Sequence, residues 1–153
     1  MLAQPFLLFL HVAAVVVWVG GMFFAYVCLR PAAVESLDPP LRLTLWMGVF
    51  RRFFAWVWGA VGVILLSGLA MLLAVGFAAA PLHWHLMLAT GLLMSGVFAY
   101  VATVPFAVLR AAVAAADWKA GGAALGRIRQ LVGFNLALGL FTVALATLGR
   151  LFA

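Results

Sequence analysis

The chain has very little charge and a single cysteine. Only 8% of its 153 residues are charged, while 69% are hydrophobic. So apolar a chain cannot cover its own surface with polar groups, which excludes a water-soluble fold. Cys28, the one cysteine, excludes an internal disulfide. The composition predicts an integral membrane protein.

Acidic residues are also scarce. The three acids are Glu35, Asp38 and Asp117, and all of them fall in predicted loops. Hydrolytic chemistry inside a bilayer therefore has no candidate carboxylate pair and no hydroxyl–histidine–acid set. Phosphate loops and metal-type cysteine pairs are absent from the sequence as well. These absences leave cofactor binding, metal handling and a purely structural role as the function classes.

Four apolar runs are long enough to cross a membrane, since a helical span needs about 20 residues. They cover about 5–29, 53–78, 82–108 and 130–151. We expect one all-α transmembrane domain over 1–153, folded as a four-helix bundle. The first run has no Lys or Arg before Arg30 and exceeds the apolar length of a signal peptide, so we expect it to be retained.

Basic residues gather in the first and third predicted loops. The positive-inside rule then places these loops in the cytoplasm and both termini outside, which predicts a multi-pass protein of a bacterial inner membrane. We interpret the cations as topology signals beside lipid headgroups and expect no nucleic-acid partner. They are Arg30, Arg42, Arg51 and Arg52 in the first loop, with Arg110, Lys119, Arg127 and Arg129 in the third.

Local signals predict three further features. Residues Leu41–Phe50 are predicted to form a short interfacial helix after a proline-containing turn. Pro81 marks a helix start after a short loop, which makes the second and third spans an antiparallel hairpin. The third loop is expected to extend the third span and then break at Gly121-Gly122.

Three histidines lie within or beside the apolar runs, and an imidazole in a bilayer is a functional-site hypothesis by default. His11 lies six residues after Pro5 and His85 four residues after Pro81. These offsets correspond to roughly 9 Å and 6 Å along a helix, so the rings lie at similar depth. If the first and third spans are neighbours or diagonal, the rings can face each other as two axial haem ligands.

Helical rotation separates the remaining candidates. His83 and His85 are two residues apart, about 200° around a helix, so only one of them faces inward. We interpret His85 as the inner ligand and His83 as an outer companion for a haem propionate or a water. Trp18 is expected to stack on the haem or close its edge. The faces then expected to enclose it are His11, Val15, Trp18 and Met22 on the first span, and His85, Ala89, Leu92 and Gly96 on the third.

Asn135 lies inside the last span, and a buried amide requires a partner. Its amide either forms a hydrogen bond between helices or lies beside a ligand. Arg127 and Arg129 precede it at the same membrane edge, where they could hold an anionic headgroup or a propionate.

Three segments together resemble the CopD-like (copper-resistance D) membrane proteins and the related membrane-type protoporphyrinogen oxidases known as HemJ. In the first, Trp18 and Gly21 follow His11 by seven and ten residues. The others are the run 81–87, reading Pro-Leu-His-Trp-His-Leu-Met, and the run 127–135, where two arginines precede an Asn. The resemblance extends over essentially the whole chain, and it depends on the order and spacing of these three segments.

The resemblance implies a four-helix bundle that binds haem b, with His11 as an axial ligand. The oxidase branch has His-x-Lys at the start of its third span, and here His85 occupies the Lys position while His83 matches the His. The oxidase also has Glu after its Asn, where this chain has Leu136. Both departures disfavour porphyrin oxidation, whereas imidazole is the better iron ligand.

Three functions are therefore carried forward. The first is a haem b cytochrome ligated by His11 and His85, an oxidoreductase that moves electrons between a quinol, which becomes a quinone, and an outer-face redox partner. The second is copper transport or resistance, with copper in place of haem. Cu(I) prefers soft sulfur ligands, yet the six methionines are scattered, with Met87 and Met94 roughly opposite His85. The third is a HemJ-like oxidase. A homo-oligomer is compatible with each of them.

Overall fold

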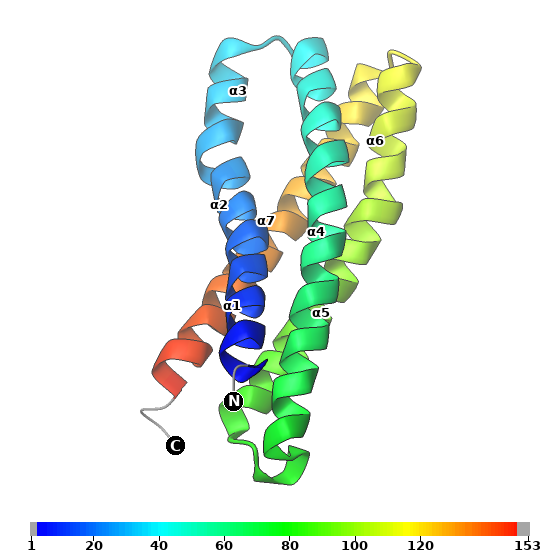
Figure 1. The fold of residues 1–153 in the computed structure, drawn as a ribbon. Coiled ribbons are helices and arrows are strands. Elements are labelled where there is room, and N and C mark those ends of the chain that lie inside the picture. The colour runs from blue at the N-terminus through cyan, green and yellow to red at the C-terminus, as the bar shows by residue number, and fades with distance from the viewer. Residues whose placement is uncertain (1–2, 150–153) are drawn as a thin grey trace.

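The computed structural model describes residues 3–149, and this part of the chain folds as an all-α bundle without strands. Within it, four helical spans are long and apolar enough to cross a membrane, and they run up and down beside one another (Figure 1). They cover Gln4–Ser36, Pro39–Val75, Leu82–Ala114 and Trp118–Leu148. The predicted all-α membrane bundle is thereby confirmed.

The first span is a helix with two π-helical stretches. A π turn holds more residues than an α turn and shifts the phase of the side chains after it. Ala14, Trp18 and Met22 are buried and recur at intervals of four, and Ala33 is buried further along the same span. Its elements are α1 (Ala3–Val15), η1 (Val16–Gly20), α2 (Gly21–Phe23), η2 (Phe24–Leu29) and α3 (Arg30–Ser36).

The second span is one unbroken helix, α4 (Pro39–Val75). The separate interfacial helix expected at Leu41–Phe50 is therefore wrong. Prolines at the first helical positions lose no hydrogen bond, and no helix breaker follows them for several turns. The helix ends at Gly76, whose φ of 92° favours glycine, and the turn η3 (Phe77–Ala79) follows.

The third span bends where α5 (Leu82–Thr103) gives way to α6 (Pro105–Ala114). The last span is α7 (Trp118–Leu148). The break predicted at Gly121-Gly122 is wrong, because these residues lie inside α7. The chain turns earlier instead, and Asp117 caps α7 by accepting a hydrogen bond from the Ala120 amide at 2.9 Å.

Aromatic rings fill the centre of the bundle. Phe50 stacks on Trp46 and on Phe54, with ring centroids 5.0 and 5.2 Å apart. Phe54 also meets Phe98 edge-on at 5.5 Å. Trp18 reaches the same Phe98 from the first span at 6.0 Å, so the first and third spans meet across the bundle. This packing leaves functional side chains to the two ends and to the seams between helices.

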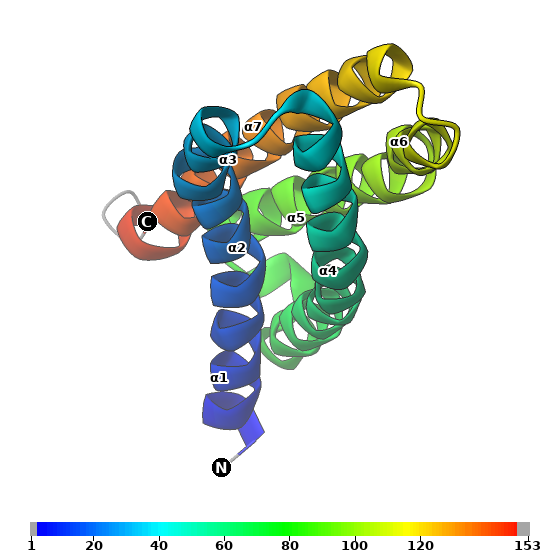
Figure 2. The same ribbon diagram turned by 90° about the horizontal axis from the view of Figure 1, so that it is seen from above.

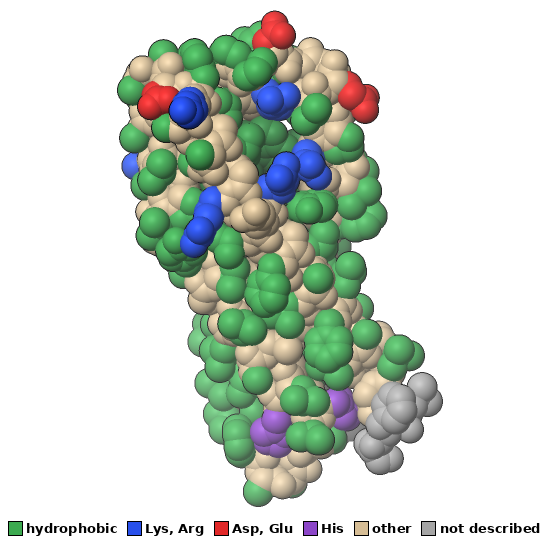
Figure 3. Space-filling model, turned by 180° about the vertical axis from the view of Figure 1, so that it is seen from behind, with side chains coloured by type: hydrophobic (Ala, Val, Ile, Leu, Met, Phe, Trp, Pro, Cys, Tyr) green, Lys and Arg blue, Asp and Glu red, His purple; other side chains and the backbone are tan. Residues whose placement is uncertain are grey.

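The two ends of the bundle differ in chemistry. Figure 3 shows Lys and Arg side chains gathered at one end and His side chains at the other. Seen from above, the first span lies beside α4, while α5 lies between α4 and α7 (Figure 2). We call the two ends the arginine end and the histidine end.

Candidate functional site

His11 is held by a chain of hydrogen bonds on α4. Its Nδ1 lies 2.9 Å from the Ser67 hydroxyl oxygen. The Ser67 hydroxyl donates to the Val63 carbonyl one turn earlier, so its oxygen accepts from the His11 Nδ1–H. The lone pair then remains on Nε2. Sequence reasoning missed Ser67, whose only signal is a lone hydroxyl in an apolar run.

His85 closes the turn between α4 and α5. Its Nε2 lies 3.0 Å from the Phe77 carbonyl oxygen and its Nδ1 lies 3.3 Å from that of Pro81. The ring also meets the Phe77 ring edge-on at 4.6 Å. Both ring nitrogens face backbone acceptors, so a metal could bind His85 only after one of these contacts had been released.

His11 and His85 have different hydrogen-bond partners in the structure. Ser67, the partner of His11, lies eight residues before the end of α4 at Val75, or about 12 Å along the helix. Phe77, the partner of His85, lies in the turn beyond that end. The partners of the two rings therefore lie at different levels of this hairpin, and the matched depth of the rings themselves stays a prediction.

The helical phase of α5 also differs from the prediction. The face expected to enclose a haem is exposed, and Leu92 on it has 53% of its surface accessible. Met94, Phe98 and Val101 are the buried residues of α5 instead. His83 shares a face with the buried Met94 and lies against Gly149 at the end of α7, whereas the sequence had favoured His85 as the inner ring.

The face of α5 that carries His83 packs along α7, and a line of nitrogen, sulfur and oxygen atoms results. We call this line the α5–α7 seam. It consists of His83, Met87, Thr90 and Met94 on α5 with Asn135, Gly139, Thr142 and Gly149 on α7.

Direct contacts define the outer half of the seam. A Cβ atom on Gly149 would lie 2.8 Å from the Cβ of His83, so only glycine admits the imidazole here. About two helical turns further in, the Thr142 hydroxyl donates to that of Thr90 at 2.8 Å. Thr90 in turn donates to the Met87 carbonyl at 3.1 Å. This half of the seam thus combines a close van der Waals contact at His83 with a hydrogen bond between the two helices at Thr90.

Asn135 lies at the inner end of the seam and is only 3% exposed. Its Nδ2 donates to the Met94 carbonyl oxygen at 3.1 Å. Its Oδ1 is the one buried side-chain polar atom without a hydrogen-bond partner among the described residues. An unpaired buried acceptor costs about 1–3 kcal/mol, so this amide favours a further ligand over helix contact alone.

Two thioethers lie at the level of Asn135. The Met94 methyl would be 3.1 Å from a Cβ on Gly139, one turn from Asn135, so the thioether occupies the space that this glycine leaves. Met22 is 2% exposed, and Val19, one turn before it, would lie 3.1 Å from the same Cβ on Gly139, so Met22 lies near this level of α7. Sequence reasoning treated these methionines as scattered, because their convergence depends on packing between three spans.

The potential ligands of the seam are all uncharged. Thioether sulfur selects Cu(I) and imidazole nitrogen also suits copper, whereas the amide oxygen is a harder, weaker ligand beside them. No group of three or more His, Cys, Asp or Glu residues able to hold a metal occurs within residues 3–149. The seam is thus a neutral, methionine-containing set of donors and differs from the acidic or cysteine-rich centres that hold hard ions or zinc.

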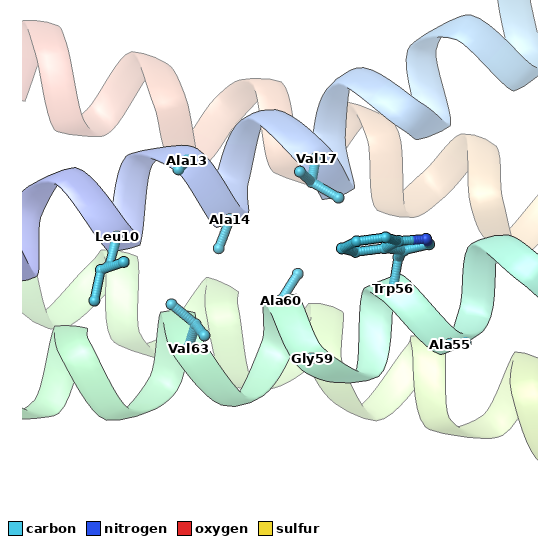
Figure 4. Close-up of a pocket in the computed structure, with 9 residues that line it drawn as sticks. All are labelled: Leu10, Ala13, Ala14, Val17, Ala55, Trp56, Gly59, Ala60 and Val63. Atoms are coloured by element: carbon cyan, nitrogen blue, oxygen red, sulfur yellow. The ribbon is translucent and has the colours of Figure 1, made fainter.

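A haem b between His11 and His85 does not fit this arrangement. Both His85 nitrogens face carbonyls, and Trp18 packs edge-on against Phe98 in the core. A groove of about 470 Å³ between the first span and α4 is lined only by apolar residues and glycine, and none of the three histidines lines it (Figure 4). Its lining residues are Leu10, Ala13, Ala14, Val17, Ala55, Trp56, Gly59, Ala60 and Val63.

Comparison with known families gives one match. The family model described as CopD, copper resistance protein D, matches residues 47–148, well over half of the chain. No curated protein and no solved structure matches the chain. The matched part contains His83, Met87, Met94 and Asn135, while His11 precedes it.

Proposed function

The chain belongs to the copper resistance protein D family, and from this premise we propose that it binds Cu(I) within the membrane along the α5–α7 seam. The observation that carries the proposal is the alignment of His83, Met87 and Met94 on the face of α5 that packs on α7. Copper is the cargo in this proposal, and the seam is the route on which it is held.

The spacing along the seam suits stepwise transfer. Met87 follows His83 by four residues and Met94 follows Met87 by seven, which are rises of about 6 and 10 Å. The line from His83 to Met94 therefore covers about 16 Å, or roughly half of a 30 Å hydrocarbon core. Transport along a pore requires several sites that bind weakly enough to release the ion. Separate donors one or two turns apart provide such sites.

Uncharged ligand atoms would also lower the free-energy cost of placing a charged ion in the bilayer. An unpaired ion at the membrane centre is expensive, and polar groups that face a bundle interior lower this cost. The Asn135 Oδ1 has no partner among the described residues and lies at the level of two buried thioethers. We infer that this level is the inner Cu(I) site and that His83 is the outer one.

The orientation of the route follows from the distribution of charge. The positive-inside rule places the arginine end in the cytoplasm, so that both termini and His83 lie toward the outer face. Copper would then reach His83 first, from outside the inner membrane of a bacterium.

Competition with a colorimetric Cu(I) chelator tests the proposal on the purified protein in lipid nanodiscs. We expect at least one equivalent of bound Cu(I), with about tenfold weaker binding in His83→Ala and in the volume-conserving Met94→Leu. His85→Ala and Met71→Leu are the matched controls, because neither residue belongs to the seam. Equal losses in the control and seam variants, or no retained Cu(I), would contradict the proposal.

The haem prediction gives a different observable. A protein with two imidazoles on haem b shows a Soret band that disappears when His11 and His85 are both replaced by Ala. We expect no such band, because His85 is held by the Phe77 and Pro81 carbonyls. Quinol-linked electron transfer and porphyrin oxidation both require this chromophore or a bound porphyrin, so the same spectrum tests them.

A further inference from the structure

A second hollow lies at the arginine end, far from the histidines. It has a volume of about 310 Å³ and opens between the end of the first span, the start of α4 and the first half of α7. Arg30, Arg42 and Arg129 line it, one from each of these three spans. Three arginines that are distant in sequence thus line one pocket.

These arginines gather without acidic neighbours in the pocket. The chain has three acids in all, and none of them is among the residues that line this hollow. The Arg30 guanidinium lies over the Tyr26 ring, 5.6 Å from its centroid, a cation–π contact that holds it at the pocket wall. Like charges brought together in this way repel one another, so an anion between them would relieve a cost already present in the fold.

The interior of the same pocket is apolar. Leu43, Trp46 and Phe50 line it and are buried in the core of the bundle. Val132 and Ile128 cover it from α7. A ligand that fits both parts has a negative head for the arginines and a hydrocarbon part for the floor. A small hydrated anion would fit only the arginines and not the apolar floor.

We propose that this pocket binds the headgroup of an anionic phospholipid, with its phosphate held by Arg30, Arg42 and Arg129. Guanidinium groups bind phosphate oxygens in pairs of parallel hydrogen bonds, which a lysine cannot do. Basic pockets between transmembrane helices are known positions for such headgroups. The site is separate from the α5–α7 seam, so it exists whether or not the chain carries copper.

Native mass spectrometry of the protein exchanged into mixed lipid tests the proposal. We expect phosphatidylglycerol to be retained in preference to phosphatidylcholine, and each of Arg42→Gln and Arg129→Gln to reduce this preference about fivefold. Arg127→Gln is the matched control, because Arg127 lies two residues from Arg129 on α7, is exposed and does not line the pocket. Arg129→Lys keeps the charge and should give an intermediate loss.

Two results would overturn the proposal. If Arg127→Gln weakens retention as much as Arg129→Gln, the preference is general surface charge. If inorganic phosphate binds the delipidated protein as tightly as short-chain phosphatidylglycerol does, the pocket holds a free anion and the apolar floor has no part in it. Thermal unfolding of every variant shows whether the fold is retained. Bound Cu(I) should be unchanged in all of them, which separates this test from that of the seam.

Discussion

His83 lies directly against Gly149, and the backbone of α7 passes so close that a Cβ atom at position 149 would come within 2.8 Å of the His83 Cβ. This contact orients the imidazole toward α7, although His85 is the ring that helix geometry and depth favoured. His85 is engaged by the turn at Phe77 instead. The two neighbouring histidines thereby have different roles, one in the seam and one in the loop.

We expect Gly149→Ala to displace His83 and weaken Cu(I) binding about tenfold, because the added methyl cannot fit beside the imidazole. Chelator competition in nanodiscs measures the change. Gly96→Ala on α5 is the control, since nothing lies within 4 Å of a Cβ added there. Unchanged Cu(I) binding in Gly149→Ala would remove His83 from the proposed route.

Replacing Asn135 by Leu should separate binding from stability. The substitution removes an unpaired buried oxygen together with one hydrogen bond, so the free energy of unfolding should change by no more than about 1 kcal/mol. Cu(I) binding should weaken about tenfold, because the amide oxygen of the inner site is lost. Unfolding in SDS and chelator competition measure the two quantities. Strong destabilisation with normal Cu(I) binding would identify Asn135 as a helix contact only.

Loss of the Ser67 hydroxyl should affect His11 and leave the seam unchanged. Ser67→Ala removes the acceptor at 2.9 Å from Nδ1, which should lower the free energy of unfolding by about 1 kcal/mol. Nitrogen NMR of labelled histidine should show His11 losing its preference for the Nδ1–H tautomer. Ser95→Ala is the control, because the Ser95 hydroxyl bonds only to the Gly91 carbonyl of its own helix. An unaltered His11 spectrum would contradict the hydrogen-bond chain described above.

Removal of the His85 ring should loosen the turn between α4 and α5. His85→Ala deletes the contacts to the Phe77 and Pro81 carbonyls, so amide hydrogen exchange over Phe77–Ala79 should become faster. Exchange in the middle of α4 should be unchanged. Slow exchange in this turn would mean that the ring does not hold it.

Asp117→Ala should destabilise the start of α7 by about 1 kcal/mol, because the Ala120 amide loses its side-chain acceptor. Asp38→Ala is a useful comparison, since Asp38 precedes α4 without a side-chain cap bond. Thermal unfolding measures both. Equal effects of the two substitutions would show that the loss reflects charge at a helix start rather than capping.

Length and hydropathy were sufficient to predict the four spans, because a bilayer imposes a minimum run of apolar residues that any sequence must display. The placement of arginines and histidines at opposite ends of the bundle could also be predicted, since it depends only on where each residue lies along the predicted spans. The ends of the helices were harder to predict from the sequence. The long α4 and the start of α7 at Asp117 depend on proline placement and capping, which compete with the turn tendency of Gly121-Gly122.

The functional faces were decided by the tertiary structure. His85 and Ser95 lie on other sides of α5 than His83 and Thr90, so polar residues do not single out the side that packs on α7. That choice placed His83 and Met94 in the seam and left His85 to the turn. Asn135 was identifiable as a buried amide from sequence, but its unpartnered oxygen was not. Which atoms surround a side chain depends on the neighbouring helices, and these lie dozens of residues away along the chain.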